Sequence, residues 1–335
     1  MFYEGMKSKG FKVNRSLTSQ EVHWRLKQGQ RLSYRQRELV DDMSLICINS
    51  TFLEVVDAYH KDRGFLTLVI ILLGGVFLTG GIGFLWLFLF GNQSPPVAFY
   101  VLIFFIFTSP HILFIWLLRL ECFTWTHYPI RFNREKQVVH ITRLNGQVET
   151  YPWQAIYFTL GRTASGFTGR FWYLQGHILA EDRDTVLDTF SVSVYGPRQE
   201  EIKRFWELVR RYMEEKDGVK HVADIAGWLL PINKRKESFG LGLRMLMMPA
   251  GFVGVLLFPF IFLQAVARWL SIRSSKMPVW PPEVEAQCEI AADDPYDFDS
   301  DDADMEWHWH FLYRPVKTQK SVTGREWPVK DDGRR

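Results

Sequence analysis

Two long uncharged apolar runs constrain the fold of this 335-residue chain more than any other feature. The first covers residues 64–90, and the second covers residues 97–118 and is uncharged apart from His111. Each run exceeds the roughly 20 residues that a helix needs to cross the hydrocarbon core of a bilayer. Two such runs in tandem would be abnormal in a soluble core, so we predict a transmembrane helical hairpin.

The charges around the two runs predict the orientation of the hairpin. Lys61 and Arg63 precede the first run and Arg119 follows the second, whereas the connection GNQSPP has no Lys or Arg. Because basic residues accumulate on the cytoplasmic side of a membrane, we predict an external connection and cytoplasmic flanks. The amino-terminal residues also lack the apolar core of a secretory signal peptide, which favours a cytosolic amino terminus.

A third apolar run, residues 245–270, contains Pro249 and Pro259 and has basic residues on both sides. The charge pattern therefore leaves two alternatives, a spanning helix with a proline kink or a re-entrant hairpin. We favour spanning, which would send the carboxyl-terminal region outside the cytosol. Between residues 277 and 313 that region has eleven acidic residues and no Lys or Arg, so we expect a solvated, largely flexible tail.

Small residues predict how the first two helices pack. Gly75, Thr79 and Gly83 recur every four residues and would let the second helix approach closely. In the second helix, Pro110 should free a carbonyl group in the preceding turn, next to the ionisable side chain of His111. We expect a neutral imidazole bonded to that carbonyl or to a nearby hydroxyl group. A proton relay or ligand site is the alternative, and it is disfavoured because the hairpin offers no charged partner.

The region after the second run changes to β-prone patterns. Two runs, VVHITR and VETYPW, flank Asn145-Gly146, the pair best suited to a type I′ hairpin turn. Three further runs rich in aromatic and β-branched residues predict an antiparallel sheet of about six strands. Beyond Gly196-Pro197, apolar residues fall at helical spacing, so we predict an amphipathic helix over about residues 198–216. Strands closed by one such helix have the element order of a pleckstrin-homology-like (PH-like) barrel.

The amino-terminal segment is expected to be folded. Thr18 and Glu21 form a capping box, which predicts a short helix from Ser19. The stretch SLICINSTFLEVVDAYH either leads into the first membrane helix or supplies strands to the following domain. The expected fold class is an α+β membrane protein, with two to three transmembrane helices and a PH-like antiparallel β-barrel capped by a carboxyl-terminal helix. The expected domains are a cytosolic segment (1–63), the hairpin (64–120), the PH-like domain (121–218), a linker (219–244), the third apolar segment (245–270) and the acidic tail (271–335).

The candidate contact residues lie in the predicted sheet. The loop GRTASGFTGR lacks the Gly-Lys-Ser/Thr ending of a phosphate-binding loop, so a hairpin loop is the favoured interpretation. Anion or lipid head-group binding by Arg162 and Arg170 is the alternative. Aromatic side chains near this loop are the expected contacts with a partner, although alternate residues of a strand face the core. They are Trp153, Phe171, Trp172 and Tyr173.

No motif supports catalysis or a cofactor. The sequence contains no GxSxG, HExxH, GxGxxG or paired CxxC pattern, and its three cysteines lie far apart, as expected of reduced thiols. His308 and His310 would share one face of a strand, but an aromatic packing strand is the favoured interpretation and no metal site is predicted. Basic residues are interleaved with acidic ones, which disfavours nucleic-acid binding. The chain is therefore expected to be non-enzymatic.

Three segments resemble those of an uncharacterised family of bacterial inner-membrane proteins often encoded beside type VI secretion genes. They are RFNREKQVVHITRLNGQVETYPWQAI, FWELVRRYMEEKDG and MPVWPPEVEAQC. The resemblance covers roughly residues 60–290, carries over no catalytic residue, and departs at Lys216-Asp217-Gly218, where Gly-Pro is expected.

The resemblance implies an inner-membrane protein with its amino terminus and PH-like domain in the cytoplasm. It would act by binding a protein partner, either an effector or a secretion component, in an accessory or immunity-type role. A regulator that binds membrane lipid head groups through the PH-like domain is the alternative. A membrane-active toxin is a third class of function.

Overall fold

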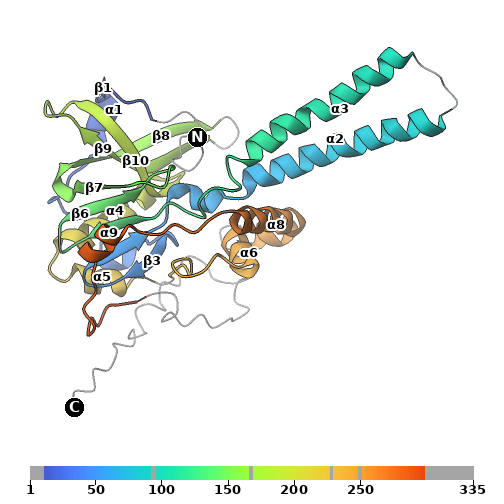
Figure 1. Cartoon of the computed structure of the whole chain (residues 1–335). Helices are drawn as coiled ribbons and strands as arrows, with labels where there is room; N and C mark the ends of the chain where they lie inside the picture. Colours follow the sequence, from blue (N-terminus) through green and yellow to red (C-terminus); the bar gives the residue numbers. More distant parts are fainter. Residues whose placement is uncertain (1–10, 92–95, 166–168, 227–228, 248–250, 299–335) are drawn as a thin grey trace. The chain divides into compact units, whose positions relative to one another are not determined.

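The protein is an α+β chain of two compact units that are both discontinuous in sequence (Figure 1). The computed structural model describes residues 11–91, 96–165, 169–226, 229–247 and 251–298. What we call the sheet unit comprises residues 1–61, 127–236 and 277–335. What we call the helical unit comprises residues 62–126 and 237–276. The helical unit therefore interrupts the sheet unit twice along the chain.

The first sheet combines strands from both sides of the apolar hairpin. Its order is β3-β4-β5-β6-β7, with every neighbouring pair antiparallel. The strands are β3 (Leu45–Ile48), β4 (Phe52–Val55), β5 (Ile130–Asn133), β6 (Val138–Thr142) and β7 (Val148–Pro152). The predicted hairpin at Asn145-Gly146 is confirmed by the β6–β7 pair, but the predicted type I′ turn is wrong, because Gly146 has a positive φ (83°) and Asn145 does not. The stretch SLICINSTFLEVVDAYH was expected either to lead into the first membrane helix or to supply strands. Because it contains β3 and β4, it supplies strands.

The second sheet also takes strands from the amino-terminal segment. Its antiparallel order is β1-β10-β9-β8-β2. The strands are β1 (Arg15–Ser16), β2 (Arg25–Leu26), β8 (Ile156–Ser165), β9 (Gly169–Leu179) and β10 (Thr185–Gly196). The prediction of one sheet closed into a barrel is wrong in this respect, because two separate five-stranded sheets form. The strands that the second sheet gains from the amino-terminal segment, β1 and β2, have two residues each and are too short for a periodic pattern.

One apolar core joins both sheets to α4 (Gln199–Glu214), which confirms the predicted amphipathic helix. Phe132 of the first sheet, Phe158 and Phe190 of the second, and Trp206 of α4 are all buried in it. The capping box at Thr18 is also confirmed, at the start of α1. The other short helices of this unit are α1 (Ser19–His23), η1 (Gln36–Glu38), η3 (Trp153–Ala155), α5 (Gly218–Ala223) and α9 (Pro282–Gln287).

The first part of the predicted flexible tail is packed on the sheet unit. We call residues 277–298 the strap. Cys288 is buried against Phe52 of β4, and the Asp294 carboxylate accepts hydrogen bonds from the amide (2.7 Å) and hydroxyl (2.7 Å) of Ser50. Phe298 then pairs with Ile48 as an isolated antiparallel bridge. The prediction of a flexible tail from residue 271 is therefore wrong for the strap. Apolar residues alternate with the acidic ones in its sequence.

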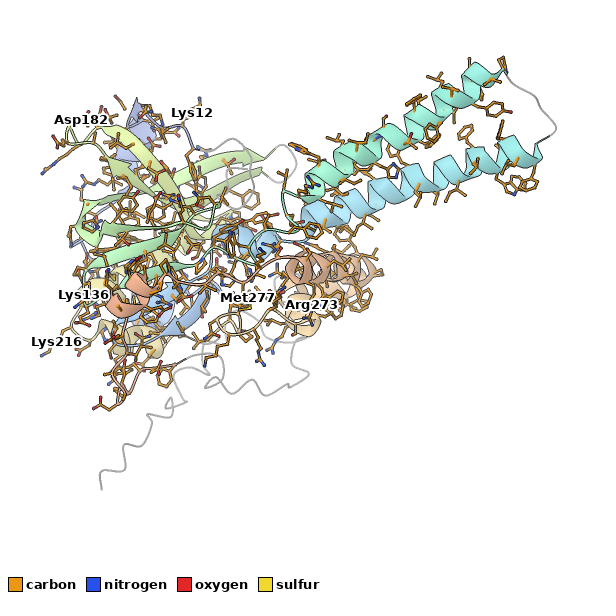
Figure 2. The ribbon with its side chains drawn as sticks, viewed as in Figure 1. Lys12, Lys136, Asp182, Lys216, Arg273 and Met277 are labelled. Atoms are coloured by element: carbon orange, nitrogen blue, oxygen red, sulfur yellow. The ribbon has the colours of Figure 1, made fainter. Side chains whose placement is uncertain are left out.

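The helical unit contains the two long apolar helices and three shorter ones. Its helices are α2 (Phe65–Phe90), α3 (Val97–Leu118), α6 (Phe239–Met247), α7 (Gly251–Leu256) and α8 (Phe258–Ser274). A short 3-10 turn, η2 (Ala58–Asp62), leads into α2. Helices α2 and α3 run side by side (Figures 1 and 2), and most of their side chains are exposed. Both are long and apolar enough to cross a membrane, and little of either is buried inside the protein.

The third apolar run is not one continuous helix. It is divided among α6, α7 and α8, and Pro259 occupies the first turn of α8. Proline fixes its own φ and lacks an amide donor, so it is accepted in a first turn and interrupts a helix elsewhere. In the part of the chain that the structure describes, α2 and α3 are the two helices long enough to span, so the favoured third span is not supported.

Helices α2 and α3 pack as predicted, but through a different face. An added Cβ would meet nothing within 4 Å at Gly75 or Gly83, and Thr79 is exposed. The close approach is instead at Gly80, where a Cβ would lie 2.3 Å from the ring of Phe107. The predicted small-residue face is therefore wrong, because the bulky rings of α3 select the neighbouring helical face.

The imidazole of His111 is bonded within its own helix. Its Nδ1 lies 2.9 Å from the carbonyl oxygen of Phe107. This is the residue after Ile106, whose carbonyl Pro110 leaves without an amide donor. A local backbone bond was expected, and it forms one residue along from the freed carbonyl.

A buried arginine and a buried glutamate join the ends of the apolar hairpin. Arg63, just before α2, donates to the carbonyl oxygen of Glu121 (2.7 Å) and to Ser275 Oγ (2.7 Å). The Glu121 carboxylate, just after α3, accepts from the amides of Gly64 (2.5 Å) and Thr67 (2.7 Å). A carboxylate at a helix amino terminus satisfies free amides and interacts well with the helix dipole.

Helix α8 is held at the same place by a close backbone approach. Gly64 has φ of 92°, and an added Cβ would lie only 2.4 Å from Arg268 Cα. Arg268 is fully buried and forms two hydrogen bonds with Glu237, from Nε to Oε1 (2.6 Å) and from Nη2 to Oε2 (2.7 Å). The start of α2, the segment before α6 and the middle of α8 are thus joined, and only glycine fits at position 64.

Candidate functional site

A cavity of about 380 Å³ opens on the sheet unit where the amino-terminal segment meets β8 and α4. We call it the Trp24 pocket. Its lining includes His23, Trp24, Arg25, Leu32, Tyr34 and Lys203. The volume lies near the lower end of the roughly 300–1,000 Å³ of small-ligand pockets. It therefore has room for one or two side chains of a partner.

Trp24 is the aromatic centre of the pocket. It follows α1 directly, and its carbonyl oxygen accepts a hydrogen bond from the amide of Leu160 in β8 (3.2 Å). Its ring makes edge contacts with His23 (4.6 Å between centroids) and Trp172 (5.3 Å). The Nζ atom of Lys203 in α4 lies 5.8 Å from the centroid of Trp24. A half-buried indole between aromatic neighbours and a cation is well suited to hold a ring or an apolar side chain.

Buried charges of α4 hold the loop that forms one wall of the pocket. The amide of Leu32 donates to Glu207 Oε2 (3.1 Å), and Arg211 Nη2 donates to the carbonyl oxygen of Tyr34 (2.5 Å). Burial alone would raise the pKa of Glu207, but hydrogen bonds from Arg210 and Arg211 lower it. Glu207 is therefore ionised inside the protein and fixes the loop. These side chains belong to the segment FWELVRRYMEE, whose charges have a structural role here.

Four cations surround the pocket, each over an aromatic ring. They are Arg25 over Tyr157 (4.6 Å), Arg162 over Trp172 (5.3 Å), Lys203 over Trp24 (5.8 Å) and Arg204 over Tyr34 (5.8 Å). The exposed carboxylate of Glu200 lies beside them; it accepts a hydrogen bond from the Tyr34 hydroxyl (2.5 Å) and forms an ion pair with Lys203 (3.2 Å). The four cations outnumber this exposed carboxylate, whereas Glu207 and Glu21 nearby are buried and paired with arginines.

Tyr34 keeps its proton at physiological pH. Burial raises the pKa of Tyr34, and the hydrogen bond to Glu200 raises it further. The same hydrogen bond lowers the pKa of Glu200, so this carboxylate stays ionised and oriented. The phenol is therefore a fixed wall of the pocket and not an acid or a base. The cations and aromatic rings of the pocket are suited to binding a ligand and not to catalysis. A complementary ligand would carry carboxylates or phosphates beside an apolar anchor.

Two of the sequence-predicted contact residues lie beside this pocket. Antiparallel pairing of β8 with β9 puts Arg162 opposite Trp172. Arg162 is exposed, and Trp172 is half-buried with its ring against Trp24. Only this part of the predicted partner surface is therefore next to the Trp24 pocket.

The other predicted contact residues are not at the pocket. Trp153 is 0% exposed and stacks on Trp206 at 5.5 Å in the core, so its prediction as a surface contact is wrong. It follows a proline in a 3-10 turn, which directs its ring inward. Phe171 and Tyr173 are half-buried in β9. Arg170 pairs through its backbone in β9, and its side chain lies outside the described residues.

Sequence reasoning missed the residues that form the pocket itself. Trp24, Tyr34 and Lys203 are separated by up to 179 residues, and they meet only through tertiary contacts, the pairing of β2 with β8 and the bonds of the loop at residues 32–34 to α4. Trp24 directly follows a capped helix, which was the one local signal. Nothing in its spacing to Tyr34 predicted a shared cavity.

A second buried polar cluster resembles a catalytic arrangement but is used for structure. His177 Nδ1 lies 2.7 Å from Thr189 Oγ1, and its Nε2 lies 3.2 Å from Glu21 Oε1. The Glu21 carboxylate also accepts two hydrogen bonds from Arg15 (2.6 and 2.8 Å) and one from the Thr18 amide (2.8 Å). Burial would raise the pKa of Glu21, but these donors lower it well below its ordinary value. Since His177 and Thr189 are buried, the cluster fixes α1 against β9 and β10.

A third cluster fixes the strap. Arg131 of β5 pairs with the buried Glu54 of β4 (2.8 Å), and its guanidinium lies 4.5 Å from the ring of Trp280. Trp280 donates its indole N–H to Glu54 (3.2 Å). The next outward side chain, Asn133, donates to the carbonyl oxygen of Gln287 (2.7 Å). The segments RFNR and MPVWPPEVEAQC therefore face each other.

No three His, Cys, Asp or Glu side chains within the described ranges are grouped to hold a metal ion. The predicted interpretation of His308 and His310 as an aromatic packing strand lies outside those ranges.

Comparison with known proteins identifies one family. No curated protein and no solved structure matches the chain. A family model described as a family of unknown function, DUF6708, matches residues 107–292, which is more than half of the chain. The matched region begins inside α3 and runs through the strap, so it includes β5–β10, α4 and the third apolar run. The chain therefore belongs to the DUF6708 family.

Proposed function

We propose that this chain is a non-enzymatic integral membrane protein that acts by binding a protein partner through the Trp24 pocket. The observation that carries the proposal is the combination of a half-buried indole with four cations on one surface. Aromatic and arginine side chains dominate binding energy at protein interfaces. The partner segment that fits this surface has an aromatic or large apolar anchor flanked by Asp or Glu.

The membrane part of the proposal has α2 and α3 crossing the bilayer with the sheet unit in the cytoplasm. Exposed apolar side chains along both helices support insertion, because water would solvate them poorly. Strand β4 precedes the hairpin and pairs with β5 after it, so both ends of the hairpin belong on one side of the membrane. Lys61, Arg63 and Arg119 at those ends support the cytoplasmic side.

The biological setting is proposed from the resemblance of three segments to bacterial inner-membrane proteins encoded beside type VI secretion genes. In that setting the protein is an accessory or immunity-type component, and its partner is an effector or a secretion component. Antiparallel strands followed by one amphipathic helix support a distant relation of the sheet unit to PH-like domains.

The partner-binding proposal is tested with the intact chain in detergent. The probes are two short peptides with one Trp, flanked by Glu in one and by Lys in the other. We expect the acidic peptide alone to bind, with an affinity that falls as salt rises, because exposed charges are screened. Trp24→Ala and Lys203→Glu should each abolish this binding.

The pocket and the wider function are separated by a second measurement. A partner that co-purifies with the intact chain is identified and titrated against the Trp24→Ala variant. Unchanged affinity for that partner would refute the pocket as the contact surface. Phe171→Ala is the matched control, because Phe171 lies in β9 next to Trp172 but on the opposite face of the strand. This variant should bind the partner as tightly as the unsubstituted chain does.

Lipid head-group binding is the competing function, because Arg162 is exposed beside the pocket. Salt-sensitive binding of anionic vesicles that is lost in an Arg162→Glu, Arg170→Glu variant would favour it. Binding of one protein by the unsubstituted chain, without binding of the anionic vesicles, would favour the protein partner.

A further inference from the structure

We infer that residues 251–263 form a re-entrant wedge, which enters the cytoplasmic leaflet of the membrane and returns to the cytoplasmic side. This inference rests on the proposed crossing of the membrane by α2 and α3. It assigns a lipid-contacting surface to the third apolar run. On this inference the run does not cross the bilayer.

The first argument comes from the path of the chain. The segment before α6 belongs to the sheet unit up to residue 236, and the strap belongs to it again from residue 277. Ser50 and Ile48, from the first sheet, bond to the strap at Asp294 and Phe298. A folded unit lies on one side of a membrane, so the chain between these points must leave and return on the same side. A single span is incompatible with this path.

The second argument comes from exposure. Nine of the thirteen side chains from residue 251 to residue 263 are exposed large hydrophobics. Phe252 is 80% exposed and Leu256 is 73% exposed. A patch of this kind in water would cause aggregation, whereas in a lipid leaflet it loses its contact with water. The patch belongs to the same unit as the proposed membrane helices, so lipid is the adjacent partner.

The third argument comes from length. The part of α8 before Arg268 has only ten residues, from Phe258 to Ala267, whereas a helix needs about 20 to cross the hydrocarbon core. Helix α8 is fixed at Arg268, which packs on Gly64 at the start of α2. From there to Phe258 is about ten residues, or about 15 Å of helix. This is half of the about 30 Å thickness of the hydrocarbon core. The wedge can reach the middle of the bilayer and no further.

The fourth argument comes from the change in polarity along α8. Its apolar end begins at Phe258, whereas its other end carries Arg268, Ser271 and Arg273. Arg273 is exposed at the end of α8 and lies 5.8 Å from the ring centre of Trp269 (Figure 2). A tryptophan beside a basic residue is typical of the membrane interface. Basic residues precede α6 and follow α8, which fits a leaflet with anionic lipids on the cytoplasmic side.

Single-cysteine labelling in bacterial cells and in inside-out membrane vesicles tests the wedge. The variants are Asn92→Cys between α2 and α3, Phe252→Cys in the wedge, Lys276→Cys after α8, and Leu187→Cys on the sheet unit. The unsubstituted chain, whose three thiols are buried or half-buried, gives the background. A membrane-impermeant maleimide is the reagent, and each variant is first checked for an unchanged elution profile in detergent.

The wedge predicts that Lys276→Cys and Leu187→Cys react in inside-out vesicles and not in cells. Phe252→Cys should react at least tenfold more slowly than Leu187→Cys in vesicles, and should react readily once detergent has replaced the lipid. Reaction of Lys276→Cys from the outside would overturn the inference, because the third run would then span. Equal reaction of Phe252→Cys and Leu187→Cys in vesicles would overturn it too, as would protection of Phe252→Cys that persists in detergent, which indicates a protein cover.

The same set of variants separates this inference from the proposed function. Asn92→Cys should react in cells and not in inside-out vesicles if α2 and α3 cross the membrane. If Asn92→Cys reacts only in vesicles, the hairpin itself does not span and the proposed membrane topology fails. If it reacts in cells while Lys276→Cys also does, the hairpin stands and only the wedge fails.

Discussion

Arg131→Met should release the strap from the first sheet. The side chains of Arg131 and Glu54 are each 6% exposed, and the guanidinium is also stacked between the rings of Phe52 (4.1 Å) and Trp280 (4.5 Å). Methionine keeps much of the apolar stem but leaves Glu54 as a buried carboxylate without its cation. Removing one partner of a buried ion pair costs about 3–5 kcal/mol.

The cost can be read from the reactivity of Cys288. This thiol is 3% exposed and lies 3.5 Å from Asn133 Nδ2, so it reacts only when the strap opens. If the lower figure of about 3 kcal/mol acts on that opening, the rate of reaction with a maleimide rises on the order of 100-fold. Mass spectrometry of the labelled protein distinguishes Cys288 from Cys47 and Cys122.

The double variant Arg131→Met, Glu54→Gln is the control. Glutamine can still accept the indole N–H of Trp280 but carries no charge, so most of the protection of Cys288 should return. Acidification gives a second check. Burial already raises the pKa of Glu54, and Arg131 offsets only part of this. The contribution of Glu54 to the stability of the folded protein is present below the pKa that Glu54 has in the unfolded chain, and it is lost as pH rises. The reactivity of Cys288 in Arg131→Met should therefore approach that of the unsubstituted chain as pH falls. Equal Cys288 rates in all three proteins would refute the role of the pair.

Three further predictions follow from other sites. Gly64→Ala should lower the stability of the helical unit by at least about 1–3 kcal/mol, because its φ of 92° and the approach of Arg268 exclude a Cβ; thermal unfolding in detergent measures this, and Gly75→Ala should leave it unchanged. Burial and the charge of Arg131 lower the pKa of His140 from 6.5 to about 4, so stability should fall as pH drops from about 6.5 to 4; the fall should be smaller in His140→Leu in a pH series of urea titrations. Trp24→Ala should abolish binding of the acidic peptide while shifting the Tm by only a few degrees, because Trp24 is half-buried; a Tm loss as large as that of a core tryptophan would count against its role as a contact residue.

The elements that the sequence predicted well are those with one dominant local pattern. The apolar hairpin, the turn at Asn145-Gly146 and α4 each follow from a run, a pair or a period. The strands β1 to β4 were harder to predict. Each has only two to four residues, and β1, β2 and β4 have pairing partners more than seventy residues away, whereas β3 pairs with the neighbouring β4. Short strands take their stability from partners, so local periodicity carries little of the information.

The segment IRFNR shows what the sequence could indicate about roles and what it could not. Alternation correctly implies that Ile130 and Phe132 share a face, and both are in the core. That Arg131 and Asn133 on the other face hold the strap required knowledge of residues about 150 positions later. Arg134 donates to carbonyl oxygens at the end of α4, among them that of Glu215 (2.5 Å). Such partners are fixed by tertiary structure and not by spacing.

The candidate site divides in the same way. The choice of Arg162 and Trp172 came from a loop and its flanking strand, and both are beside the pocket. Trp153 was misplaced because an aromatic residue in a strand-rich region can face either way, and a 3-10 turn decided its direction. Trp24 gave one weak local signal, its place after a capped helix, because its role depends on neighbours contributed by β9 and α4.

The interrupted sheet also sets an order on biosynthesis. Strand β4 leaves the ribosome before the apolar hairpin and β5 leaves after it, yet they are adjacent in the first sheet. The strap, which covers that sheet, is translated only after α8. The first sheet therefore cannot be completed until the apolar hairpin and α8 have left the ribosome, and until then a nascent chain has unpaired strand edges. Such edges are sites of aggregation, so the yield of folded protein depends on how the apolar hairpin is handled while the rest of the first sheet is being synthesised.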